Sequence, residues 1–91
     1  MKKLIDIAKK AMEKPNYEFS TVYDGFSFGI YWDTNRRMLV CCMSYTPSWP
    51  HCHFIYGQDV EQFIENAKAR IAEDKKIYKN GGKYPEDYYE R

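Results

Sequence analysis

The chain of 91 residues lacks the features of a membrane or exported protein. No apolar run approaches the roughly 20 residues that a membrane-spanning helix requires. The start, Met1-Lys2-Lys3, leads into an amphipathic segment, whereas a signal peptide would continue with an uninterrupted apolar region. We therefore expect a soluble protein that is not exported.

Cysteine and histidine are scarce and confined to one segment. The chain has 3 cysteines and 2 histidines, namely Cys41, Cys42, His51, Cys52 and His53. Three cysteines, two of them adjacent, cannot form a fully paired disulfide framework, and this usage is typical of a reducing compartment. We predict free, buried thiols and a cytoplasmic location.

Signals for polyanion binding and for cofactors are absent as well. The net charge is only +1, so no surface of a single sign favours a polyanion partner. Gly81-Gly82 follows a predicted helix instead of opening one, and it therefore makes no phosphate-binding loop. A chain this short seldom houses both an active site and a substrate pocket. We predict a binding protein without cofactors, not an enzyme.

The first half of the chain predicts a helix followed by a hairpin. From Lys2 to Lys14 apolar residues recur at helical spacing while lysines fill the opposite side. Residues 17–23 and 26–33 are rich in aromatic and β-branched types, and Asp24-Gly25 between them is a strong hairpin signal. The side of the second strand that should face the core consists of Phe26, Phe28, Ile30 and Trp32.

The second half predicts two more strands and a longer helix. The run 38–45 is apolar on both faces and should be the central strand. A short strand over 51–56 would return beside it, and Asp59 with Gln62 forms a capping-box signal for a helix that ends before Asn80-Gly81-Gly82. No linker or internal repeat interrupts the pattern.

These elements predict a single α+β domain over residues 1–91, with residues 83–91 as a tail that we expect to be mobile. The predicted architecture is an N-terminal helix, a three- to four-stranded antiparallel β-meander and a long C-terminal helix. Both helices should pack on one sheet face, because each has a single apolar stripe.

A zinc site is one alternative for the cysteine and histidine cluster. A structural zinc needs about four ligands, and the best set is Cys41, His51, Cys52 and His53. Neighbouring residues on a strand point to opposite faces, so Cys41 and Cys42 should not reach one ion together, whereas His51 and His53 should share a side. The same divergence makes both histidines poor bases for a Cys52 nucleophile. The plainer interpretation is that free cysteines are small buried hydrophobes.

A second alternative is the binding of nucleic acid or a nucleotide. Single strands could stack on outward aromatics of the sheet, with Arg36 and Arg37 for phosphates. The aromatics expected there are Tyr17, Phe19, Tyr23 and Tyr31. The ribonucleoprotein signature is missing, and residues 16–66 hold 6 acidic residues against 2 arginines. A nucleic acid is therefore not the favoured partner.

Exposed aromatic residues favour a protein partner. Trp49 lies between Pro47 and Pro50 in a stiff loop that costs little entropy to dock, and tryptophan and tyrosine lead among interface hot spots. The predicted contact residues are Tyr45, Trp49, Tyr56, Arg36 and Arg37.

In size and in its aromatic-rich composition, with 9 tyrosines and no recognisable active site, the chain resembles the accessory proteins of bacteriophages and mobile elements. Anti-CRISPR proteins are among them. The resemblance involves no motif. It implies a protein that acts stoichiometrically by occupying a larger bacterial protein or complex.

Overall fold

The computed structural model describes residues 1–45 and 52–79. The predicted loop contact Trp49, the zinc candidate His51 and the predicted tail 83–91 therefore lie outside the described residues, as does the side chain of Tyr45.

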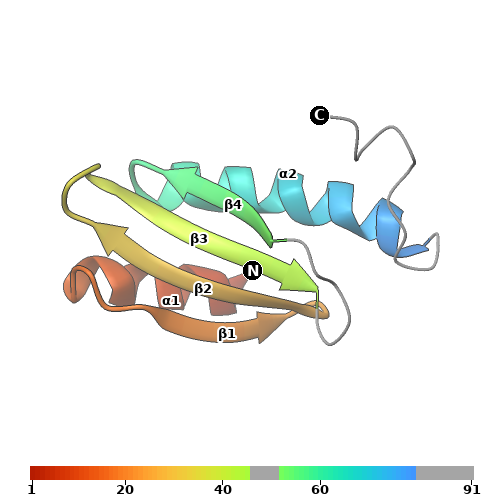
Figure 1. The fold of residues 1–91 in the computed structure, drawn as a ribbon, viewed down its shortest axis with the longest axis horizontal. Helices are drawn as coiled ribbons and strands as arrows, with labels where there is room; N and C mark the ends of the chain where they lie inside the picture. The colour runs from red at the N-terminus through yellow and green to blue at the C-terminus, as the bar shows by residue number, and fades with distance from the viewer. Residues whose placement is uncertain (46–51, 80–91) are drawn as a thin grey trace.

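Two helices cover one face of a four-stranded antiparallel sheet (Figure 1). The elements are α1 (Lys2–Glu13), β1 (Phe19–Tyr23), β2 (Phe26–Asp33), β3 (Met38–Tyr45), β4 (Cys52–Gly57) and α2 (Val60–Lys79). The strands pair in the order β1-β2-β3-β4, and α1 packs behind β1 and β2 while α2 packs behind β4. This confirms the predicted α+β fold, with four strands in the meander.

The turns follow from local chemistry. Asp24 and Gly25 both take positive φ angles, 56° and 84°, as a two-residue hairpin turn between β1 and β2 requires. Between β2 and β3, Asp33 Oδ1 accepts hydrogen bonds from the backbone N–H groups of Asn35 and Arg36 at 2.9 and 3.1 Å. Both predicted hairpins are therefore present.

The start of α2 is capped as predicted. Asp59 Oδ1 accepts a hydrogen bond from the Gln62 N–H at 2.8 Å, and Gln62 Oε1 accepts one from the Gln58 N–H at 2.7 Å. The second bond goes to the residue before the N-cap, one position earlier than in the usual capping box. The bond from the Gln62 N–H satisfies a first-turn donor that the helix itself leaves unpaired, and the bond from the Gln58 N–H fixes the residue that leads into the helix.

The core lies between the sheet and the helices. We call this side of the sheet the inner face and the uncovered side the outer face. The side of β2 predicted to face the core does so: Phe26, Phe28 and Ile30 are buried, and Trp32 is partly buried and packs against the core. Val40, on the outer face of β3, is also only 2% exposed. Met38, Cys42 and Ser44 on the same face are partly exposed, so the prediction that β3 is buried on both faces holds on the outer face at Val40 alone among the described side chains. The other buried core residues are Leu4, Ala8, Ala11, Leu39, Cys41, Met43, Ile55, Phe63, Ile64, Ala67 and Ile71.

None of the helices in the described part of the chain is long and apolar enough to cross a membrane.

Candidate functional site

The sheet separates the cysteines from one another. Cys41 is fully buried on the inner face of β3, and burial raises the pKa of its thiol to about 12. Its neighbour Cys42 lies on the outer face, as strand alternation predicts. Cys41 therefore stays protonated at neutral pH and is a poor nucleophile there.

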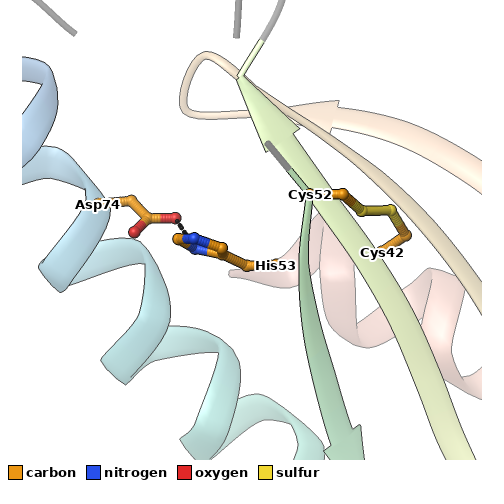
Figure 2. The surroundings of a disulfide bond; sticks show 4 residues. All are labelled: Cys42, Cys52, His53 and Asp74. Atoms are coloured by element: carbon orange, nitrogen blue, oxygen red, sulfur yellow. Dashed lines mark hydrogen bonds and ion pairs between the residues drawn. A yellow bond between two sulfur atoms is a disulfide. The ribbon is translucent and has the colours of Figure 1, made fainter. Parts of the chain in front are cut away.

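Cys42 and Cys52 form a disulfide on the outer face (Figure 2). In the register of β3 and β4, Cys42 pairs with Phe54 and Cys52 with Ser44, so the two cysteines are diagonal neighbours. Their Cα atoms lie 6.1 Å apart, within the span that disulfides bridge. The prediction of free, buried thiols is therefore wrong for these two residues and right for Cys41.

The members of the candidate zinc set that the structure describes, Cys41, Cys52 and His53, do not come together, and His51 lies outside the described residues. Cys52 is bonded to Cys42 on the outer face, whereas His53 points to α2 on the inner face. Among residues 1–45 and 52–79, no three His, Cys, Asp or Glu side chains are grouped so that they could hold a metal ion. Strand alternation at Cys52 and His53 is the physical reason.

On the inner face, His53 of β4 contacts a buried acid on α2. Its Nδ1 lies 2.9 Å from Asp74 Oδ2, and Asp74 is only 3% exposed (Figure 2). Arg70 Nη2 lies 3.2 Å from the other oxygen, Oδ1, which accepts no hydrogen bond within the described structure and is held by charge attraction. We call these three residues the His53–Asp74–Arg70 network. It ties the edge strand to the helix.

This network was missed in the sequence. Asp59 was the nearest acid along the chain, but it caps α2 instead. Asp74 follows Ile71 by three residues and so continues the apolar stripe of α2. A carboxylate that falls on the apolar stripe of a helix indicates a charged or hydrogen-bonding partner in the core, because an isolated buried charge is very costly.

Within the described residues, Cys52 does not complete His53 and Asp74 as a catalytic site. Nucleophilic catalysis would need a hydroxyl or thiol within reach of the imidazole. The nearest thiol in sequence, Cys52, projects from the opposite face and is oxidised. The arrangement supports a structural tie between β4 and α2.

The free energy of unfolding should depend on pH through Asp74. Burial raises the pKa of this carboxyl, and the positive charges of His53 and Arg70 oppose the shift. The folded state therefore binds the proton more tightly than the unfolded state. The stabilisation of the folded state by this proton is complete when the pH is below 3.8, the ordinary pKa of the aspartate carboxyl. It is lost as the pH rises through the higher pKa that Asp74 has in the folded state.

We expect the stability of the protein relative to Asp74→Asn to increase as the pH is lowered from about 7 towards that ordinary value. Urea titrations of both proteins measure the difference, and a ¹³C titration of the Asp74 carboxyl should show a midpoint above 3.8. A midpoint below it would mean that the ion pairs outweigh desolvation.

The outer face carries exposed aromatic residues at β4. Phe54 is 59% and Tyr56 40% exposed, and their rings stack with centroids 6.4 Å apart. A groove of about 440 Å³ runs beside them. It is lined by Phe54, Ile55, Tyr56, Asn66, Ala69, Arg70 and Glu73. Phe54 was not among the predicted contacts, although it shares strand parity with Tyr56 and must face the same way.

The other predicted contacts lie elsewhere. Arg36 and Arg37 belong to the turn between β2 and β3, and Arg36 makes an ion pair with Asp33 at 3.6 Å. Tyr56 pairs with Val40 toward that end of the sheet, whereas Tyr45 ends β3 at the other. The backbone positions therefore separate Tyr45 from Tyr56.

The predicted aromatic platform for nucleic acid is wrong in two of its members. Phe19 and Tyr23 pair with Ile30 and Phe26 and lie on the inner face, where they pack against the core. Tyr17 precedes β1 and contacts the Phe19 ring and Lys14. Of the four aromatics, Tyr31 is the one that alternation places on the outer face of a strand.

The molecule is thus an α+β protein with one helix-covered and one open sheet face. Comparison with protein-family models, with curated proteins and with solved structures found no match to the chain.

Proposed function

We propose that the chain is a protein-binding module that contacts its partner through the outer face at β4. The supporting observation is the stacked pair Phe54 and Tyr56, exposed at 59% and 40% beside a groove. Apolar aromatic rings exposed side by side at a groove are typical of interaction sites, and tyrosine is enriched at hot spots. Both residues lie on β4, a strand of a packed sheet, so little entropy is lost when the pair docks.

The proposed role is stoichiometric binding to a larger bacterial protein or complex, as an inhibitor of the phage or mobile-element type. It rests on the small size and aromatic composition of the chain together with this surface. The cytoplasmic location belongs to the same proposal. There the Cys42–Cys52 disulfide would form only under oxidising conditions, because cytosolic thiols are kept reduced.

The test compares two substitutions on the same face. The tagged protein isolates its partner from a bacterial lysate, mass spectrometry identifies it, and calorimetry with the purified partner gives Kd. We expect Phe54→Ala combined with Tyr56→Ala to raise Kd by about 30-fold, or about 2 kcal/mol. Val22→Ala is the matched control, because Val22 is 54% exposed on the outer face of β1, far along the sheet.

The proposal is supported if the double variant shows this rise in Kd while the Val22→Ala variant keeps a Kd within about threefold of that of the original protein, and if the complex has a stoichiometry of one to one. An unchanged Kd for the double variant would exclude this surface as the contact. Tight binding of short oligonucleotides that weakens steeply with salt would point to a nucleic acid partner instead.

A further inference from the structure

β4 is an edge strand with a groove along its open side. It pairs with β3 on one side, and within the described residues no strand pairs with its other side. The groove lies between β4 residues Phe54 to Tyr56 and α2 residues Asn66 to Glu73. What the groove can bind depends on which backbone groups of β4 point into it.

The side chain of Asn66 identifies them. Asn66 Nδ2 donates a hydrogen bond of 2.7 Å to the carbonyl oxygen of Tyr56, so this carbonyl points from β4 toward α2 and away from β3. In an antiparallel strand the N–H and C=O of one residue point to the same side, and successive residues alternate. Phe54 therefore directs its N–H and C=O to the open edge, while Ile55 directs its own to β3.

The opposite edge of the sheet leads to the same assignment. Lys3 Nζ donates to the Val22 carbonyl oxygen at 3.1 Å, so this carbonyl points away from β2. Val22 lies opposite Ser27 of β2, so the backbone groups of Ser27, and of Gly29 two residues on, point to β3. Gly29 lies opposite Cys42, whose backbone groups therefore point to β2. The next residue, Cys41, points its groups to β4, where it lies opposite Ile55. Alternation therefore directs the backbone groups of Cys41 and Ile55 at each other and those of Phe54 outward.

The open edge thus presents a short row of backbone donors and acceptors. None of the loop and turn hydrogen bonds of the described residues uses the Phe54 backbone. The row runs from Cys52 to Tyr56, about 13 Å at roughly 3.3 Å per residue. It ends where Asn66 occupies the Tyr56 carbonyl. The complement of such a row is the backbone of another extended chain.

We propose that an extended segment of the partner protein adds to the sheet as a fifth strand along β4. The proposal rests on the proposed function, because the segment would lie beside Phe54 and Tyr56. Its backbone pairs with Phe54 and with the N–H of Tyr56. Every second side chain of the segment lies on the outer face, where a β-branched or aromatic residue packs beside the rings of Phe54 and Tyr56.

The side chains of the segment that face the groove should be small and uncharged. Ala69 leaves room on α2, and it is flanked by Arg70 and Glu73, which carry opposite charges. No single charge on the partner would complement this wall.

The test separates the Phe54 side chain from its N–H. Peptides of about twelve residues are selected from a phage-displayed random library on the intact protein and resynthesised. Phe54→Ala removes the ring and keeps the N–H, whereas Phe54→Pro removes both. Proline is tolerated on an edge strand when its nitrogen faces outward. We expect Phe54→Pro to bind at least about tenfold more weakly than Phe54→Ala. Val22→Pro and Val22→Ala, the matched pair at the other edge, should bind equally.

A second measurement does not depend on the folding of a proline variant. In the free protein the amides of Phe54 and Tyr56 should exchange with solvent faster than that of Ile55, and the peptide should protect them. N-methylation of every second peptide amide should abolish binding when the methylated amides face β4, and should leave binding unchanged when they face away from β4.

Equal binding by Phe54→Pro and Phe54→Ala, both weaker than the original, would overturn strand addition and leave the aromatic contact surface standing. Unchanged binding by Phe54→Ala would overturn the proposed function itself. Strand addition by a partner also fails if no peptide is selected, or if the Phe54 amide is already protected in the free chain. A concentration-dependent dimer that Phe54→Pro disrupts would identify a second copy as the occupant.

Discussion

Gly57→Ala is expected to lower the free energy of unfolding by about 3 kcal/mol. A Cβ atom at this position would lie 2.5 Å from the Cα and 2.6 Å from the Cβ of Phe63. Phe63 is fully buried in the first turn of α2, and its N–H donates to the Asp59 carbonyl at 3.0 Å. The added methyl therefore meets backbone that cannot yield without moving the helix off the core.

Gly29→Ala is the matched control, because Gly29 is also a glycine in a strand. A Cβ there would meet the Glu18 carboxylate, with Oε1 at 2.5 Å. This is the end of an exposed, flexible side chain that can turn away, so we expect a change within about 0.5 kcal/mol. Urea denaturation of both variants measures the difference. Equal losses would show that α2 can shift at its start without cost.

The same glycine illustrates where sequence reasoning stops. In the sequence, Gly57 was visible only as the end of a strand. The need for glycine comes from the approach of α2, which depends on how the whole helix packs. By contrast, the Asp24-Gly25 turn and the Asp59 cap were predictable, because each depends on groups within a few residues.

The candidate site shows the same division. Alternation alone places Cys41 and Cys42 on opposite faces, and it would have placed Phe54 beside Tyr56. The Cys42–Cys52 pair could not be predicted, because it requires the register of β3 against β4. A shift of one residue would have turned Cys52 to the other face. The contact of His53 with Asp74 likewise needs the position of α2 on the sheet.

His53→Ala is expected to destabilise the protein by about 2 to 3 kcal/mol at neutral pH. Removal of the imidazole leaves the Asp74 carboxylate, only 3% exposed, without its hydrogen bond from β4. Removing one partner of a buried pair commonly costs about 3 to 5 kcal/mol. We expect less here because Arg70 remains 3.2 Å from the same carboxylate.

The control is the same substitution in an Asp74→Leu background. Leucine fills the site without a charge, so His53→Ala should then cost only the lost packing, about 1 kcal/mol. The difference between the two backgrounds, about 1 to 2 kcal/mol, is the coupling energy between β4 and α2. Urea denaturation of the four proteins completes the cycle. Because His53 and Phe54 are adjacent on opposite faces of β4, a large coupling also means that α2 holds in place the strand to which we propose that a partner binds. A coupling near zero would show that packing of the sheet alone positions β4.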